Sequence, residues 1–293
     1  MKHLLKFKRV SECPIDQLVD VWNRGFKGYI VDVSMTMQSF LKKMVTEDLD
    51  PEHSVVAFDG DYPVGIVMTG FRQGEDALYA WNGGTAIDPE YRGTGVSHAL
   101  MEEVLSVYKE KGVHTAYLEA ISTNIRAIKL YEKHGYELIE RLTFFSGPEE
   151  GQDITVIHDY ELECIRVPSE KIQSLSFYQR HMPWQNQLES LKEGIGYILY
   201  DRERPIGYAM TKETYDEKGQ LKSVQIYQLG IEPVLEGDSL LLITFLHKIF
   251  KLERDGIKRL IFNFPNRDDH VLSALSELGF HKTIEQVHMK KLL

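Results

Sequence analysis

A turn between a predicted strand and a predicted helix gathers residue types that suit phosphate. It offers a guanidinium, two glycines and two hydroxyls in the run Arg92, Gly93, Thr94, Gly95, Val96 and Ser97. Apolar residues recur at helical spacing after this run, which predicts a helix that begins near Gly95. A helix N-terminus presents unpaired backbone N–H groups at the positive end of the helix dipole. Because glycines let an anion approach that backbone and Arg92 can pair with it, the turn predicts a phosphate site. The alternative is a plain glycine-containing connection.

A second segment, residues 118–136, carries a carboxylate and a phenol on neighbouring elements. Glu119 lies near the end of a predicted strand, and Asn124 lies in the polar stretch that follows it. Tyr131 lies in the next predicted helix, which closes at Gly135, where a glycine commonly ends a helix. Interior strands seldom bury a carboxylate without a purpose, so Glu119 is a candidate for acid–base chemistry. A carboxylate bonded to nearby backbone is the alternative.

The elements that position these residues follow from hydrophobic periodicity and from turn composition. Strands are predicted at His3–Val10, Ser54–Phe58, Val64–Gly70, Ala77–Ile87, Thr115–Ile121, Glu137–Phe145 and Ile154–Leu162. Helices are predicted at Ile15–Phe26, Met37–Val45, after Gly95, and at Ala127–His134. This order indicates the α/β class, as an α+β mixed sheet with flanking helices.

The second half of the chain repeats the first. The stretch VVAFDGDYPVGIVMTG is matched by YILYDRERPIGYAMTK, so that Pro63 and Gly65 recur as Pro205 and Gly207. Further on, Ile87-Asp88-Pro89 recurs as Ile231-Glu232-Pro233, and Gly135-Tyr136 recurs as Gly279-Phe280. A repeat this long that holds its register indicates two copies of one fold. We expect two domains, residues 1–162 and 163–293.

Composition excludes several classes of protein. The 293 residues hold 34 Lys and Arg against 44 Asp and Glu, for a net charge of −10, whereas nucleic-acid binders are normally basic. Apolar runs are too short to span a membrane, and no signal-peptide pattern follows Met1. Cys13 and Cys164 are too few for a disulfide framework, so the expected compartment is the cytoplasm. We expect no nucleic-acid or membrane partner.

The two motifs together resemble those of the GNAT superfamily of N-acetyltransferases. Residues 92–97 resemble its pyrophosphate motif, Gln/Arg-x-x-Gly-x-Gly/Ala, and residues 118–136 resemble its companion pattern of Leu-Glu, Asn, Ala, Leu-Tyr and Gly-Phe/Tyr. The order of elements also resembles the family's mixed sheet. The resemblance covers residue 3 to roughly residue 162, and the second half by fold only. Ser97 stands where the motif has Gly or Ala. Because its hydroxymethyl is small and can donate to phosphate, we expect a modest cost.

The resemblance implies a place for acetyl-CoA as co-substrate. The thioester would lie in a V between two parallel strands that splay apart, here Ala77–Ile87 and Thr115–Ile121. The pantetheine arm would pair with backbone around Ala86, Ile87 and Asp88, and the pyrophosphate would lie on residues 92–97. Asn124 would reach the arm from the other side. Each domain is then expected to be a twisted, largely antiparallel sheet with one splayed parallel pair.

The resemblance also implies catalytic roles. Tyr131 is similar to the family's general acid, which donates to the sulfur as the C–S bond breaks, and Glu119 is similar to its base, acting through water. A tyrosine packed in the core is the alternative for Tyr131. Tyr29, Tyr79, Trp81 and Asn82 could line the acceptor pocket, although aromatic residues on strands are more often core. His98 and His134 are read as surface or helix-end residues, and no cluster has metal-ligand spacing.

The second copy lacks these residues. In the register that pairs Gly135 with Gly279, Arg92, Thr94 and Gly95 become Glu236, Asp238 and Ser239, and Tyr131, Glu119 and Asn124 become Leu275, Asn263 and Asp268. Two carboxylates at the pyrophosphate turn should repel the cofactor. We therefore expect the second domain to be structural or to help shape the acceptor site.

The leading function is an N-acetyltransferase that moves acetyl from acetyl-CoA to a primary amine by direct attack in a ternary complex. The alternative is a non-catalytic acyl-CoA-binding or sensing module, which would need neither Glu119 nor Tyr131. A protein–protein scaffold would leave the glycine turn without a purpose. The acceptor, a small-molecule or peptide amine, and the oligomeric state stay open, because acceptor pockets are built by variable loops.

Overall fold

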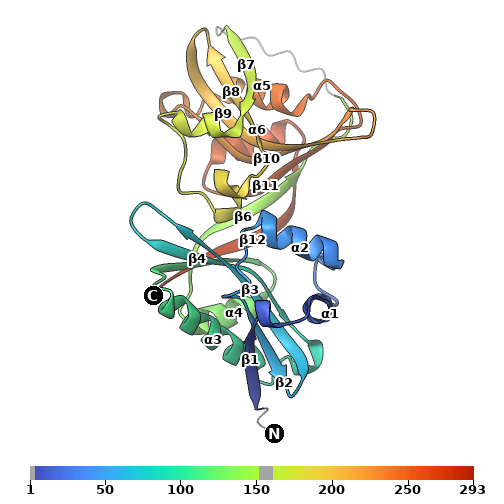
Figure 1. Cartoon of the computed structure of the whole chain (residues 1–293). Coiled ribbons are helices and arrows are strands. Elements are labelled where there is room, and N and C mark those ends of the chain that lie inside the picture. Colours follow the sequence, from blue (N-terminus) through green and yellow to red (C-terminus); the bar gives the residue numbers. More distant parts are fainter. Residues whose placement is uncertain (1–3, 152–160) are drawn as a thin grey trace. The chain divides into compact units, whose positions relative to one another are not determined.

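The computed structural model of the chain describes residues 4–151 and 161–293 (Figure 1). The chain divides into two compact units, Met1–Ile139 with Val287–Leu293, and Glu140–Gln286. This division differs from the expected boundary at residue 162. The reason is that two strands, β6 (Glu137–Ser146) and β12 (His281–Leu292), run across it, so that the end of the chain belongs to the first unit.

The first unit is built on a mixed sheet. Its strand order is β1 (Leu5–Arg9), β2 (Val55–Asp59), β3 (Tyr62–Gln73), β4 (Leu78–Ile87), β5 (Thr115–Ile121) and then β12. The pairs from β1 to β4 are antiparallel, and β4 pairs with β5 in parallel. The predicted mixed, largely antiparallel sheet is confirmed for this unit.

Helices cover the sheet of the first unit. They are α1 (Ile15–Gly25), α2 (Met37–Thr46), α3 (Val96–Glu110) and α4 (Ile125–Lys133). The core under α3 and α4 includes Ala80, Leu118 and, from the last strand, Met289. Because side chains alternate along a strand, Trp81 and Glu119 point to the opposite face of the sheet.

The second unit repeats the element order of the first. Its strands are β7 (Leu162–Pro168), β8 (Ile195–Asp201), β9 (Arg204–Tyr215), β10 (Leu221–Ile231), β11 (Lys258–Pro265) and part of β6, with helices α5 (Ser239–Phe250) and α6 (Asp269–Glu277). Two equivalent pairs have the same length, since β3 and β9 each have 12 residues and α4 and α6 each have 9 residues. The predicted duplication is confirmed.

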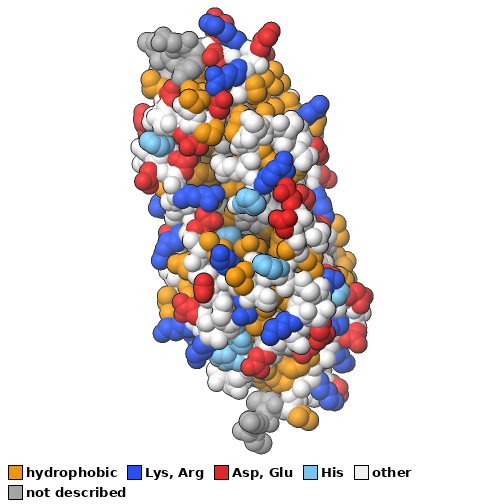
Figure 2. Space-filling model, turned by 90° about the vertical axis from the view of Figure 1, so that its left-hand side faces the viewer, with side chains coloured by type: hydrophobic (Ala, Val, Ile, Leu, Met, Phe, Trp, Pro, Cys, Tyr) orange, Lys and Arg blue, Asp and Glu red, His pale blue; other side chains and the backbone are white. Residues whose placement is uncertain are grey.

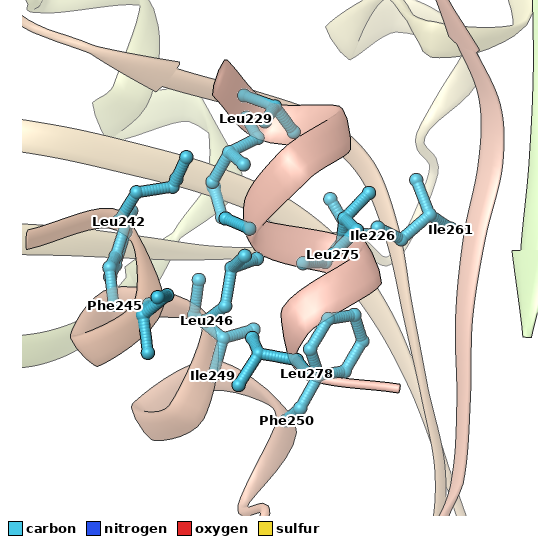
Figure 3. Close-up of a cluster of buried hydrophobic side chains, with 14 of the residues drawn as sticks. Ile226, Leu229, Leu242, Phe245, Leu246, Ile249, Phe250, Ile261, Leu275 and Leu278 are labelled. Atoms are coloured by element: carbon cyan, nitrogen blue, oxygen red, sulfur yellow. The ribbon is translucent and has the colours of Figure 1, made fainter. Parts of the chain in front are cut away.

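The two copies differ before their second strand. Where the first unit has α1 and α2, the second has short 3-10 turns at Ser169–Ser174, Trp184–Asn186 and Leu188–Ser190. Its core still resembles that of the first unit, since α5 and α6 bury Leu246, Phe250 and Leu275 against Ile226 and Ile261 of the sheet (Figure 3). The predicted strand Ile154–Leu162 lies outside the described residues except for its end, where β7 begins.

Local signals placed the helices of the first unit well. Helix α3 begins at Val96 with Gly95 as its N-cap at φ +99°, as predicted, and Gly135 follows α4 at φ +81°. Thr36 caps α2 by accepting from the Ser39 N–H at 3.2 Å. These residues stop and start helices through backbone geometry and capping that can be read from the sequence.

Within residues 4–151 and 161–293, no helix is long and apolar enough to cross a membrane. On the face shown in Figure 2, Lys and Arg side chains are interspersed with Asp and Glu. A nucleic-acid backbone would favour a stripe of positive charge. The described part of that face carries no such stripe.

Candidate active site

The parallel strands β4 and β5 separate halfway along their length. Their ladder runs from Tyr79↔Thr115 to Asn82↔Leu118 and ends there. Strand β4 continues to Ile87 while it stays paired with β3, so its other edge faces a gap. An irregularity in the β3–β4 ladder at this point, beside Gly84 at φ +149°, bends β4 away. The structure therefore contains the V that the resemblance implied.

Asn82 holds the bend in place. Its Oδ1 accepts from the Gly84 N–H at 2.9 Å, and its Nδ2 donates to Thr85 Oγ1 at 2.8 Å. A Cβ at Gly84 would lie 2.4 Å from the Trp22 ring, so glycine lets α1 approach the strand closely. Asn82 is thus a residue that shapes the gap, with both ends of its amide used.

The glycine turn lies open beside the start of α3. Residues Arg92 to Gly95 are exposed, and Gly93 has φ +82°. A Cβ at Gly95 would have no described heavy atom within 4 Å, and one at Gly93 would meet only Arg126 Nη2, at 4.0 Å. The backbone of this turn is therefore accessible to a ligand. The sequence reasoning missed Arg126, whose place on the first turn of α4 could have pointed to it.

The Arg92 side chain is hydrogen-bonded to the backbone of α1 and of β4. Its Nη2 donates to Gly25 O at 2.7 Å and its Nε to Ile87 O at 3.2 Å. The guanidinium therefore ties the end of α1 to the end of β4. Thr94 Oγ1 donates to Tyr91 O at 2.7 Å, which closes the turn. The prediction that Arg92 and Thr94 hold phosphate stays a prediction.

Asp88 is also engaged within the fold. Its buried carboxylate pairs with Arg24, accepts from the Glu90 N–H at 3.0 Å and accepts from Tyr62 Oη at 3.3 Å. Its backbone N–H donates to Val64 O at 2.9 Å. Asp88 therefore fixes the end of β4 through its side chain.

Asn124 caps α4 and reaches a loop residue. Its Oδ1 accepts from the Ala127 N–H at 3.3 Å. Burial raises the pKa of Tyr29, and a hydrogen bond with Asn124 partly opposes that shift. Tyr29, from the segment between α1 and α2, thus lies beside the start of α4 with its side chain half-buried.

Tyr131 has its ring in the core and its hydroxyl at the gap. The side chain is 6% exposed, and its ring centroid lies 6.0 Å from that of Tyr136. Burial raises the pKa of Tyr131 to about 12, partly opposed by a hydrogen bond with Thr85, which lies on the splayed part of β4. The phenol therefore stays protonated at neutral pH. The ring lies in the core, and the catalytic role of the hydroxyl stays a prediction.

Glu119 lies at the first position of β5 beyond the last pair with β4. Its side chain is 5% exposed, and Oε1 lies 3.7 Å from Nε2 of His288, which is 8% exposed. His288 lies on β12, so it reaches this site from the far end of the chain. The sequence reasoning missed it, and a histidine between apolar Val287 and Met289 is the signal that could have found it.

The aromatic residues on β4 lie on the same face as Glu119. Trp81 is fully buried beneath Arg72, whose guanidinium carbon is 5.1 Å from the ring centroid, so Trp81 is core. Tyr79 is half-buried, with its ring centroid 6.0 Å from that of Tyr117.

Two histidines lie together at the ends of neighbouring helices. His98, in the first turn of α3, and His134, at the end of α4, approach to 3.2 Å between Nδ1 and Nε2. In the described part of the chain no group of three metal-ligating side chains lies together.

The second unit has a V of its own, and protein fills it. The β10–β11 ladder ends at Ile226↔Ile261. Asn186 Nδ2 donates to the carbonyls of Tyr227 and of Phe262, at 2.9 Å for the latter, and thereby bridges the two strands beyond their last pair. The space that would receive a thioester is occupied by a side chain.

The residues of the second unit that replace the candidate site have other partners. Asn263 is fully buried and donates to Gln185 Oε1 at 2.8 Å. Asp238 and Asp268 cap α5 and α6 through the N–H groups of Leu241 and Val271. A cavity of about 780 Å³ remains beside these two helix starts. It is lined by acidic and basic side chains of Glu236, Asp269, Arg180, Arg267, His181 and His270, among others.

Comparison with known proteins adds to this geometry. Residues 17–136 match the acetyltransferase (GNAT) family. The chain is similar to [Ribosomal protein bS18]-alanine N-acetyltransferase of Escherichia coli, with 32% identity over 73 residues, which are 25% of this chain and 49% of that protein. The chain thus spans about half the length of the curated relatives it matches.

Solved structures share the fold over nearly the whole chain. A GCN5-related N-acetyltransferase from Sphaerobacter thermophilus has a TM-score of 0.68 at 13% identity, covering 98% of this chain and 95% of that one. A tandem GNAT protein from the clavulanic acid biosynthesis pathway has a TM-score of 0.66 at 14% identity, covering 98% of both chains. The chain therefore has the fold of two GNAT-like domains in tandem.

Proposed function

The chain carries an acetyltransferase domain of the GNAT family, and from this premise we propose that it moves an acetyl group from acetyl-CoA to a primary amine. The observation that carries the proposal is the gap between β4 and β5. In this proposal the hydroxyl of Tyr131, which has a hydrogen bond with Thr85 on the splayed part of β4, is the proton donor to the leaving group. The carboxylate of Glu119, on β5 just beyond its last pair with β4, is the proton acceptor.

The donor site fits the diphosphate part of acetyl-CoA. The turn at Gly93 and Gly95 offers accessible backbone beside the N-terminus of α3, and Arg126 adds a cation there. The free edge of β4 around Ile87 offers backbone groups to the pantetheine arm, because β5 has left it. In this proposal Thr94, Val96 and Ser97 complete the diphosphate-binding turn, and Arg92 maintains the shape of that turn. Asn124 contacts the pantetheine arm from the side opposite β4.

The reaction proceeds by direct attack. The acceptor enters as an ammonium ion, and Glu119, through water, takes one proton from it. The free amine nitrogen attacks the thioester carbonyl carbon and forms the C–N bond, and the C–S bond breaks with its electron pair on the sulfur. The nitrogen then gives up its second proton, which balances the negative charge of the thiolate. A thiol is a stronger acid than a phenol whose pKa is about 12. Tyr131 therefore acts mainly by donating a hydrogen bond to the sulfur as negative charge develops there.

The second unit is proposed to be non-catalytic. Asn186 occupies its V, and Asn263 and Leu275 stand in place of the base and the acid. Acetyl transfer is therefore assigned to the first unit alone. The acceptor is proposed to be the primary amine of a small molecule or of a peptide, with Tyr29 and Tyr79 among the residues that meet it.

The test is a panel of amines assayed with acetyl-CoA by release of the free CoA thiol. The panel should include polyamines, amino acids, aminoglycosides and peptides with free N-termini. Turnover of at least one amine that falls in Tyr131→Phe and Glu119→Gln supports the enzyme. Tight acetyl-CoA binding without turnover of any amine would instead identify an acyl-CoA-binding module.

A further inference from the structure

A second buried titratable group lies beside the proposed base. Nε2 of His288 is 3.7 Å from Oε1 of Glu119, with the two side chains 8% and 5% exposed. The neighbours of His288 on β12, Val287 and Met289, are 4% and 0% exposed in the core of the first unit. The packing of this strand therefore fixes the imidazole next to the carboxylate.

An aromatic ring and a carboxylate are packed against His288. Its ring packs on that of Tyr117, with centroids 5.5 Å apart and planes at 34°. Burial raises the pKa of Tyr117, so this phenol is neutral near pH 7. Glu119 is then the anionic group against the imidazole, while Lys290 follows on the same face of β12. A carboxylate within 4 Å stabilises an imidazolium.

The acceptor nitrogen gives up more protons than a single carboxylate can hold, so a second proton acceptor beside Glu119 would have a role. An acceptor that arrives as an ammonium ion loses two protons on the way to an amide, whereas the departing thiolate takes up one. A carboxylate holds one proton at a time. An imidazole can accept a proton on one ring nitrogen and release it again.

We propose that His288 is the proton partner of Glu119 in the acetyl transfer. Glu119 takes a proton, through water, from the acceptor nitrogen and passes it to Nε2 of His288. The O–H bond of the acid breaks, the N–H bond of the imidazolium forms, and the regenerated carboxylate takes the second proton from the nitrogen, which balances the charge of the departing thiolate. The imidazolium releases its proton to solvent before the next turnover. This inference rests on the proposed function, and His288 acts through Glu119 as a positioning residue.

The distance of 3.7 Å is longer than a hydrogen bond. Catalytic hydrogen bonds are commonly long without substrate and shorten in the complex, so the separation is compatible with transfer. The proposal also gives the second copy a task, because the strand that ends that copy delivers His288 to the first unit.

The first test compares His288→Gln with the parent in the full chain, using the best amine from the panel under single-turnover conditions. Because glutamine cannot take up a proton, we expect kcat/KM to fall at least about tenfold near pH 7. The deficit should shrink toward pH 10, where the acceptor arrives as free amine, and the Kd of acetyl-CoA should stay unchanged. His114→Gln, an exposed histidine beside β5, is the matched control and should keep the parent profile.

A double-mutant cycle separates this role from a structural one. Since a proton that Glu119 cannot take cannot be passed on, Glu119→Gln with His288→Gln should be no slower than Glu119→Gln alone, within about twofold. Losses that multiply would overturn the inference, as would a His288→Gln variant with the parent's pH profile.

An NMR comparison of the His288 imidazole in the full chain requires no change at position 288. We expect the ring nitrogen chemical shifts of His288 to change in Glu119→Gln, because the carboxylate 3.7 Å from Nε2 is replaced by a neutral amide. Unchanged shifts overturn the pair. If the parent transfers acetyl to no amine, the proposed function fails, and the two failures are thereby distinguished.

Discussion

Asn124 and Asp268 cap equivalent helices in the two units. The Oδ1 of Asn124 accepts from the Ala127 N–H at 3.3 Å, and that of Asp268 accepts from the Val271 N–H at 3.1 Å. The cap survives in both copies, although the side chain at this position changes from an amide to a carboxylate. A capping oxygen needs only to accept a hydrogen bond, so the fold tolerates the exchange.

The caps should separate stability from cofactor binding. Asp268→Ala is expected to lower the free energy of unfolding by about 0.5–2 kcal/mol, because one N–H at the start of α6 loses its acceptor. It should leave the Kd of acetyl-CoA unchanged. Asn124→Ala should lower the free energy of unfolding by a similar amount and should also weaken the binding of acetyl-CoA. Urea unfolding and calorimetry measure the two effects, and equal Kd values for both variants would remove Asn124 from the donor site.

The glycine turn should bind acetyl-CoA once per chain, and Arg126 should contribute to that affinity. Arg126→Glu is expected to raise the Kd at least about tenfold, because a charge near the diphosphate is reversed, with little change in stability. Lys129→Glu, one turn further along the exposed face of α4, is the matched control. Arg92→Glu should weaken binding and also lower the melting temperature, since Arg92 ties Gly25 to Ile87. Calorimetry that found two equivalent sites would contradict the assignment to the first unit.

Tyr131→Phe should slow acetyl transfer without loosening the fold. The ring stays in the core while the donor to sulfur is lost, so kcat should fall by roughly 10²-fold or more and the Kd of acetyl-CoA should change little. Stopped-flow measurement of CoA thiol release, under conditions where acetyl transfer limits the rate, measures this change in kcat. Parent-like turnover would return Tyr131 to a purely structural role.

Stability should fall at alkaline pH. The folded-state pKa of Tyr131 is about 12, whereas an exposed tyrosine has a pKa near 10, because burial disfavours the tyrosinate. Burial raises the pKa of Tyr136 in the same way. The folded state therefore binds more protons between these values, so this contribution is complete below pH 10 and is lost as the pH rises toward 12. Urea unfolding at pH 8 and pH 11 should show the loss, and Tyr131→Phe should reduce it.

The last strand should matter to the first unit. Met289 is fully buried there, so Met289→Ala should cost about 2–5 kcal/mol. Leu292 is 63% exposed on the same strand, so Leu292→Ala should cost little. Acetyl-CoA should also raise the melting temperature of the Met289→Ala variant less than it raises that of the parent. Equal melting temperatures for the two variants would contradict the packing of β12 in this core.

The sequence by itself determined the elements of the first unit, the duplication and the glycine turn. The elements and the turn are local properties: helical periodicity set α3 and α4, and glycines with positive φ set the turn and the end of α4. The second copy was readable because Pro63 and Gly135 recur in register as Pro205 and Gly279. Backbone conformation and capping depend on a few neighbouring residues, which is why they can be read directly.

Only the tertiary structure decided which distant side chains share a site. His288 meets Glu119 because β12 crosses into the first unit, and Asn186 fills the second V because a short turn inserts there. Arg92, expected to face a ligand, also donates to two backbone carbonyls. Strand exchange and the partners of long side chains depend on contacts between residues far apart in the chain, and no local pattern encodes them.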